Sequence, residues 1–201
     1  MILAVAAFFL DSELLATESA LVFLLDLLFI WFFRDPERTA SGTGDEIVSP
    51  ADGKVVHIRG NTACIFMNFH NVHVNRAPVS GKIVQMHHRD GGYLPAFSKD
   101  SHNNERNIIC IESDYGLVKM TQIAGTVPRR IDTYFNVGDR VTRGERIGMI
   151  RFGSRVDITP PEGFALTIKK GDRVKAAVSI VARKMDEASE AIPYNNNNKG
   201  E

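Results

Sequence analysis

The sequence lacks several features that would place it at once in a functional class. It carries 24 Lys plus Arg and 24 Asp plus Glu among 201 residues, so its net charge is zero. Because the chain has no net positive charge to attract the phosphates of nucleic acid, we expect no nucleic-acid partner. The chain has only two cysteines, Cys64 and Cys110, which lie far apart and form no metal-type pair. Because each lies in an apolar run, we expect two buried, reduced thiols.

A metal site has little support either. His87, His88 and His102 could supply ligands, but their spacing matches no common zinc site. We therefore expect no metal.

Long hydrophobic runs are also missing. Residues 1–10 and 20–33 are strongly apolar, but a polar segment at 11–18 separates them and Asp26 interrupts the second run. Neither run reaches the roughly 20 residues that a helix needs to cross a bilayer. The chain begins without a basic segment and has no clear small-residue cleavage site, so a secretory signal is not expected.

Residues 1–35 are expected to form an apolar helical hairpin that dips into one leaflet of the cell membrane. In this interpretation the protein is peripheral or monotopic, Trp31 lies near the interface, and Arg34 and Arg38 lie at the headgroups. The alternative is a pair of helices packed on the protein's own core.

Residues 36–185 are expected to be rich in β-strands. Short apolar or alternating runs follow Pro36, and Asp-Gly, Asn, Pro and Gly-Asp pairs separate them. Segment 136–145 is similar to the turn-rich repeats of biotinyl and lipoyl carrier domains. We therefore expect a mainly β fold, an antiparallel barrel-sandwich of hammerhead-like pieces. The polar tail at 186–201 is expected to be disordered. The expected strands are 55–58, 63–69, 82–84, 107–112, 117–123, 147–152, 156–158, 165–168 and 176–181.

The pair Gly153-Ser154 combines a nucleophile with an unprotected carbonyl. Such pairs usually mark turns, and alone this one is a weak signal. A glycine, however, gives its carbonyl little steric protection and tolerates backbone angles that other residues resist. If a base removes the Ser154 hydroxyl proton, the oxygen can attack the Gly153 carbonyl and convert the amide into an ester. Elimination from that ester would leave a pyruvoyl group on the new N-terminus.

Upstream segments supply the side chains that this chemistry needs. Asp52 lies in Ser-Pro-Ala-Asp-Gly at 49–53, and His70 and His73 lie in His-Asn-Val-His-Val-Asn-Arg at 70–76. An imidazole can take a serine proton, and a carboxylate can fix the tautomer of that imidazole. The chain order acid, base, nucleophile proves nothing, since such groups occur in several orders.

Each of these residues also has a plain structural interpretation. Asp52 could be an ordinary Asp-Gly turn residue, and the two histidines could be one core and one surface residue. Positions three apart point to opposite faces of a regular strand. For His70 and His73 to serve one site, we expect the backbone to turn or bulge between them.

Together these segments resemble phosphatidylserine decarboxylase in its short prokaryotic form, which includes the archaeal type that acts on archaetidylserine. The resemblance runs from about residue 32 to about residue 170. Besides the two segments above, it rests on Phe-Arg-Asp-Pro-Glu-Arg at 33–38, Asn-Asn-Glu-Arg-Asn at 103–107 and Arg-Phe-Gly-Ser-Arg-Val-Asp at 151–157. The long form carries Leu-Gly-Ser-Thr at the cut site, whereas this chain has Phe-Gly-Ser-Arg, as in the short form.

The resemblance implies a membrane-bound lyase made as a proenzyme and self-cleaved between 153 and 154 into a long and a short chain. It assigns Asp52 and His73 as acid and base of cleavage, Ser154 as nucleophile and pyruvoyl source, and His70 to decarboxylation. The amine of phosphatidylserine, or of an ether analogue such as archaetidylserine, would form an imine with the pyruvoyl group. That group serves as electron sink, with no metal and no pyridoxal phosphate.

Other expectations concern partners and place. The active site would face the cytoplasmic side of the membrane. The sequence leaves open whether the protein forms a homo-oligomer. Arg151, Arg155 and Arg106, with Arg76 as a further candidate, could bind the anionic headgroup or could be solvated surface residues. The loop at 90–107 is long enough to be a lid. The alternative function is a biotinyl-like, lipoyl-like or phosphotransfer carrier module without decarboxylase activity.

Overall fold

The computed structural model describes residues 13–92, 104–125, 130–151 and 154–185. The expectations for residues 1–12, for His102, for Gly153, for most of the proposed lid and for the tail fall outside these ranges.

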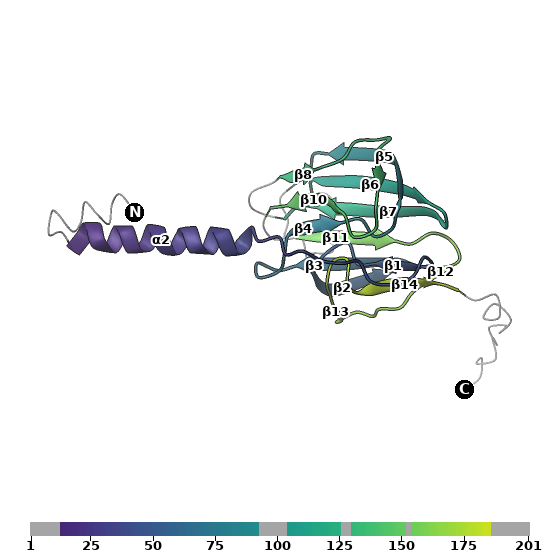
Figure 1. Cartoon of the computed structure of the whole chain (residues 1–201), viewed down its shortest axis with the longest axis horizontal. Helices are drawn as coiled ribbons and strands as arrows, with labels where there is room; N and C mark the ends of the chain where they lie inside the picture. The colour runs from purple at the N-terminus through teal and green to yellow at the C-terminus, as the bar shows by residue number, and fades with distance from the viewer. Residues whose placement is uncertain (1–12, 93–103, 126–129, 152–153, 186–201) are drawn as a thin grey trace, which may run out of the picture.

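Among the described residues, one apolar helix precedes the β-rich body and projects away from it (Figure 1). This helix, α2, spans Glu13–Phe32. Its window Leu15–Phe32 has 18 residues, a mean hydropathy of 1.9 and only 11% of its residues buried. By length and composition alone, α2 could cross a membrane. Residues 13–18, expected as a polar break between two helices, are instead its first turns. That expectation is wrong because Glu, Leu and Ala are good helix formers whatever their polarity.

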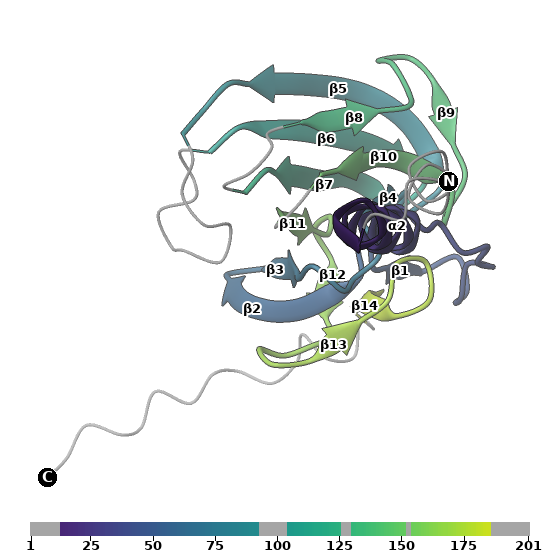
Figure 2. The same ribbon diagram turned by 90° about the vertical axis from the view of Figure 1, so that its left-hand side faces the viewer.

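The body is built on a large antiparallel sheet that curls around one face (Figure 2). Its strand order is β13-β2-β3-β11-β7-β6-β5-β9. The strands are β2 (Gly53–Arg59), β3 (Thr62–Met67), β5 (Gly81–Arg89), β6 (Arg106–Ser113), β7 (Gly116–Ile123), β9 (Arg140–Val141), β11 (Ser154–Thr159) and β13 (Arg173–Val174).

Two smaller antiparallel sheets complete the body. One has the order β1-β14-β12 and the other β4-β10-β8. Their strands are β1 (Glu46–Val48), β14 (Ile180–Lys184), β12 (Phe164–Leu166), β4 (Val74–Arg76), β10 (Arg146–Ile150) and β8 (Ile131–Thr133).

All three sheets contribute to one buried hydrophobic cluster. Ile47 of β1, Ile150 of β10 and Ile65 and Val156 of the large sheet belong to it. Because side chains alternate along a strand, one face of the large sheet supplies this core and the other lies outside it. A polar side chain on the inner face therefore needs a specific explanation.

One edge of the large sheet, meaning the side formed by the ends of its strands and not an outermost strand, lies next to the helix. Strands β3, β7 and β5 end at this edge while β2, β11 and β6 begin there, since neighbouring strands run antiparallel. The ring of Phe69, in the loop after β3, lies 5.9 Å from the ring of Trp31 and 5.2 Å from that of Phe32. The end of α2 is thus packed on the loop that carries His70.

The mainly β class, the antiparallel pairing and the apolar N-terminal helix are confirmed. Strand β5 is longer than expected, and the strand expected at 176–181 begins only at Ile180. Ala177 adopts a left-handed conformation with φ 64°, which places a turn there. Cys64 and Cys110 are buried and free, as expected, and burial raises the pKa of Cys64 to about 12.

Candidate active site

Ser154 is the first residue of β11, at the edge beside the helix. It pairs with Met67 of β3, and Val156, two residues further, pairs with Ile65, so Ser154 shares the inner, core-facing side of the sheet with them. The Ser154 side chain is fully buried, and its Oγ has no hydrogen-bond partner within the described part of the chain. A buried hydroxyl without a partner is costly. Such a group is typical of a site that is held ready for chemistry.

His73 is the second buried group without a complete set of partners. Its Nδ1 lies 2.9 Å from the carbonyl oxygen of Asn71. Because a carbonyl only accepts hydrogen bonds, Nδ1 carries the proton and Nε2 carries the lone pair. Nε2 is buried and has no hydrogen-bond partner in the described ranges. The imidazole therefore presents a proton-accepting nitrogen inside the protein.

The surroundings of His73 keep it neutral. The pKa of His73 is lowered to about 4, chiefly by burial and also by the positive charge of Arg34, while the Asn71 carbonyl and Asp52 act to raise it. The Phe32 ring covers the imidazole at a centroid distance of 4.5 Å. A neutral imidazole at physiological pH can act as a base without first losing a proton.

The segments that carry His73 and Ser154 run side by side. The backbone N–H of Ile150, at the end of β10, donates a hydrogen bond of 3.3 Å to the carbonyl of His73. The chain then passes to β11, where Ser154 pairs with the last residue of β3, and the loop from β3 leads to His73. The fold thus brings the predicted base and nucleophile to the same edge of the sheet.

Asp52 lies in a tight arrangement with Arg38 rather than in a hydrogen bond with His73. Arg38 Nη1 contacts Asp52 Oδ1, Arg38 Nη2 lies 2.9 Å from Oδ2, and the backbone N–H of Ala176 donates a bond of 2.8 Å to Oδ1. The bond with Asp52 raises the pKa of Arg38. The expectation that Arg38 lies at the lipid headgroups is wrong, since only 13% of its side chain is exposed. The sequence signal that could have indicated a role for Arg38 in the site is its position within the family segment 33–38.

His70 lies in a turn, as the site requires. The backbone N–H of Asn71 donates a bond of 2.9 Å to the carbonyl of Asn68, which closes a turn over residues 68–71, and residues 70–73 are not part of a regular strand. Arg34, which stacks over Trp31, donates a bond of 2.5 Å to the His70 carbonyl. The helix end thereby holds the turn in place. His70 and Asp52 both line a cleft of about 450 Å³.

The arginines expected to bind substrate are all engaged with the protein. Arg151 bonds Asp132 at 2.9 Å, and Arg155, which is buried, bonds Asp157 at 2.8 Å. As the alternation of β11 implies, Arg155 lies on the opposite face from Ser154. Arg106 donates to the carbonyl of Asn104 at 3.3 Å, and burial lowers its pKa. Arg76, the further candidate, is buried and bonds the carbonyl of Gly144 at 3.0 Å.

A chain of buried amides near Ser154 is not evident from the sequence. Gln122 Nε2 donates to Asn75 Oδ1 at 2.9 Å, and Asn107 Nδ2 donates to Gln122 Oε1 at 3.2 Å. Asn75 Nδ2 in turn lies 3.4 Å from the sulfur of Met67, the residue opposite Ser154. Asn75 and Asn107 fall within the segments of the family resemblance, but only the fold shows that they meet.

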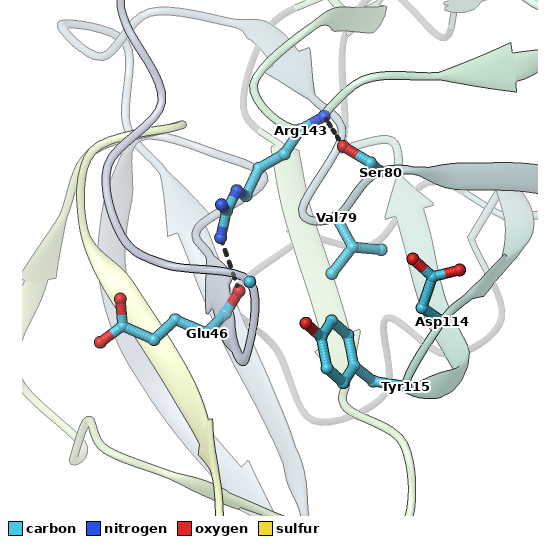
Figure 3. Close-up of a pocket in the computed structure, with 7 residues that line it drawn as sticks. Glu46, Val79, Ser80, Asp114, Tyr115 and Arg143 are labelled. Atoms are coloured by element: carbon cyan, nitrogen blue, oxygen red, sulfur yellow. Dashed lines mark hydrogen bonds between the residues drawn. The ribbon is translucent and has the colours of Figure 1, made fainter.

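No group of His, Cys, Asp and Glu within the described ranges could hold a metal ion. A separate pocket of about 130 Å³ lies near the turn between β6 and β7, at the other end of the sheet from Ser154 (Figure 3). There Arg143 donates from its backbone N–H to Ser80 Oγ and from its guanidinium to the carbonyl of Glu46. This pocket contains none of the candidate site residues.

Known proteins with similar sequences are named as decarboxylases. The family model described as phosphatidylserine decarboxylase matches residues 25–182. A relative from Methanococcoides burtonii, named as an archaetidylserine decarboxylase proenzyme, is 54% identical over 160 residues, which are 80% of this chain and 77% of the relative. One of the same name from Methanosarcina mazei is 56% identical over 158 residues, 79% of this chain and 76% of the relative.

A bacterial relative points the same way. The phosphatidylserine decarboxylase proenzyme of Streptomyces griseus is 48% identical over 159 residues, 77% of this chain and 73% of the relative. These matches favour the decarboxylase over the carrier module. The chain belongs to the phosphatidylserine decarboxylase family and is a carboxy-lyase.

Proposed function

We propose that this protein is a self-processing, pyruvoyl-dependent decarboxylase of a serine phospholipid, with Ser154 as the source of the pyruvoyl group. The observation that carries the proposal is that two buried atoms, Ser154 Oγ and the lone-pair nitrogen of His73, have no hydrogen-bond partner among the described residues. Both lie at the edge of the sheet where Gly153 precedes Ser154. A buried nucleophile and a neutral base at the same end of the strands support the formation of this group in the intact chain.

The formation of the pyruvoyl group balances with these residues and one water, which is consumed in the last step. His73 Nε2 takes the Ser154 hydroxyl proton as Oγ attacks the carbonyl carbon of Gly153. The carbon–nitrogen bond breaks, and the proton passes to the nitrogen of residue 154, which gives an ester. Elimination then removes the Cα proton of residue 154 to solvent, breaks the Cβ–Oγ bond, and leaves residue 153 with a free carboxylate and residue 154 as a dehydroalanine. Tautomerisation and hydrolysis release one ammonia, and residue 154 becomes the pyruvoyl end of the short chain.

The remaining residues act on the substrate. When formed, the pyruvoyl group supplies an electron sink for the loss of carbon dioxide. His70, at the wall of the open cleft, is placed to give the substrate α-carbon its proton. Asp52 acts in self-cleavage, and Arg38 positions its carboxylate. Archaetidylserine is the first substrate to test, because the relatives from Methanococcoides and Methanosarcina carry that name, and phosphatidylserine is the comparison.

Helix α2 would attach the protein to the membrane that contains this substrate. The helix is apolar on an exposed surface and ends at the loop of His70. We propose the cytoplasmic leaflet as the site of action, with the long and short chains remaining together through the pairing of β11 with β3 and β7. A homo-oligomer stays a prediction.

Intact mass measurement of the protein purified in detergent tests the proposal. We expect two chains that separate between 153 and 154, with the shorter chain lighter by one ammonia than hydrolysis alone predicts. Ser154→Ala should give one intact, folded chain. Normal splitting of this variant would contradict the assignment of Ser154.

A further inference from the structure

A cationic cleft opens next to the proposed catalytic residues. Lys54 of β2 and Arg173 of β13 are direct cross-strand partners, so their side chains project from the same face of the sheet. Phe66 of β3 lies opposite Lys54 on its other side. With Lys175 they form part of the lining of the cleft of about 450 Å³ that also contains Asp52 and His70. We propose that Lys54, Arg173 and Lys175 bind the phosphodiester of the substrate headgroup.

The charge balance of the cleft favours an anion. Asp52, the carboxylate of the lining, is already neutralised by Arg38. The side chains of Lys54, Arg173 and Lys175 are exposed, and no ion pair or hydrogen bond engages them within the described residues. Three cations without a counter-charge, converging on one cleft, attract a phosphate group.

The pocket in Figure 3 provides a contrast. Its lining contains the carboxylates of Glu46 and Asp114, and the guanidinium of its cation, Arg143, is bonded to the backbone carbonyl of Glu46 at 3.1 Å. That pocket has no cationic excess to offer an anion. A cationic lining is therefore not a general property of the cavities of this protein.

The position of the cleft suits a headgroup whose other end reaches residue 154. Phe66, in the cleft, precedes Met67 in β3, and Met67 pairs with Ser154 in the neighbouring strand. Because successive side chains of a strand alternate, the cations and Ser154 lie on opposite faces of the sheet, so a headgroup held in the cleft would reach residue 154 around the end of β3. Neighbouring strands lie about 5 Å apart. His70, in the loop that follows β3, lines the same cleft. This assignment rests on the proposed function, because it places the serine end of the substrate at residue 154.

Gly53 keeps the backbone of the cleft close to β3. A Cβ at this position would lie 2.2 Å from the carbonyl oxygen of Phe66. Because only glycine permits this approach, Lys54 is held directly beside the end of β3. The cation is thus placed by the backbone and not by a flexible loop.

Binding to the uncleaved protein tests the inference without the pyruvoyl group. In the Ser154→Ala protein, we would titrate glycerophosphoserine, the water-soluble headgroup, by calorimetry. We expect Lys54→Gln with Arg173→Gln to weaken its binding by at least about tenfold, since charge-assisted hydrogen bonds to phosphate are lost. Lys119→Gln removes an exposed lysine from the same face of the sheet at its other end, and it should leave binding unchanged.

A second arm uses the protein with Ser154 intact. The Lys54→Gln, Arg173→Gln protein should split normally, which mass measurement shows. After splitting, its KM for the serine phospholipid should be at least about tenfold higher than that of the parent, with kcat less affected. Normal splitting shows that the variant folds. If the parent protein does not split, the proposed function is wrong. The glycerophosphoserine titration still tests whether the cleft binds the headgroup.

Two results would overturn the inference. One is equal binding of glycerophosphoserine by the double variant and its parent. The other is binding of inorganic phosphate in the cleft as tight as that of glycerophosphoserine, which would make it a site for free phosphate and not for the headgroup.

Discussion

Arg38 holds Asp52 through both oxygens of its carboxylate, and the pair lies beside the cleft that contains His70. Their side chains are only 13% and 11% exposed. The same carboxylate accepts the backbone N–H of Ala176, and Arg38 also donates to the carbonyl of Ala176 at 3.0 Å. Arg38 therefore fixes the position of the Asp52 carboxylate relative to the backbone of Ala176.

Loss of this pair should slow self-cleavage. We expect Arg38→Gln to slow splitting by at least about tenfold and to lower the free energy of unfolding by about 2 kcal/mol, a value reduced because the pair is partly exposed. Arg38→Lys keeps the charge but not the two-point contact, so its splitting rate and free energy of unfolding should lie between those of the parent and of Arg38→Gln. Pulse-labelled synthesis followed by electrophoresis measures the rate of splitting.

The exposed pair of Arg183 with Glu46 supplies the control. These atoms lie 2.8 Å apart, but the Arg183 side chain is 61% exposed. Arg183→Gln should change stability by less than about 1 kcal/mol and leave splitting unchanged. If Arg38→Gln loses stability but splits at the normal rate, Arg38 is only structural.

The two histidines should separate by phenotype. His73→Ala removes the buried base and should block or greatly slow splitting, whereas His70→Ala leaves the buried base and should split yet lose turnover. Mass of the purified chains reports splitting, and release of carbon dioxide from labelled lipid reports turnover. The reversed pair of phenotypes would show that the roles are exchanged.

The pH dependence of splitting follows from the burial of His73. Burial lowers its pKa to about 4, so the ring is neutral above this value. We expect the splitting rate to be constant from roughly pH 8 to pH 5 and to fall toward pH 4. An unfolded histidine takes up its proton near about pH 6.5, so the free energy of unfolding should also decrease as pH falls through the window between these values. An inflection of the splitting rate near pH 6.5 would contradict a buried neutral base.

Much of the fold could be predicted because the long strands carry clear patterns. The runs at β3, β6 and β7 are apolar or alternating, and Asp-Gly or Asn-containing turns separate several of them. Strands such as β9 and β13 have two residues each. Such short segments show no period, and only pairing with neighbours far along the chain forms them.

The sequence predicts residues for the candidate site but not the contacts among them. The family segments identify Asp52, His70, His73 and Ser154, but they do not show that Arg38 bonds Asp52. Similarly, Lys54 and Arg173 are 119 positions apart by their residue numbers, and nothing in the sequence pairs them before the register of β2 with β13 is known. Long-range register is the information that local patterns do not contain.

Gly53 should be more sensitive to substitution than a glycine with open space around it. In Gly53→Ala the new Cβ would meet the Phe66 carbonyl oxygen at 2.2 Å, so β2 must shift away from β3. We expect a loss of at least about 2 kcal/mol in the free energy of unfolding. Gly60→Ala, where φ is +55° and no atom lies within 4 Å, should cost only the backbone strain of about 1 kcal/mol. Denaturant unfolding in the Ser154→Ala background compares them, and equal losses would show that β3 yields to the contact.

Phe32 connects the helix with the chemistry of the buried base. It is 1% exposed and its ring lies 4.5 Å from that of His73, whereas the neighbouring Phe33 is 39% exposed. Phe32→Ala should admit water to the imidazole and move the pKa of His73 upward toward its ordinary value. The fall in splitting rate should then shift from near pH 4 to about pH 6, while Phe33→Ala should leave the profile in place. An unchanged profile in Phe32→Ala, with splitting retained, would show that the body of the protein and not the helix end excludes water from the base.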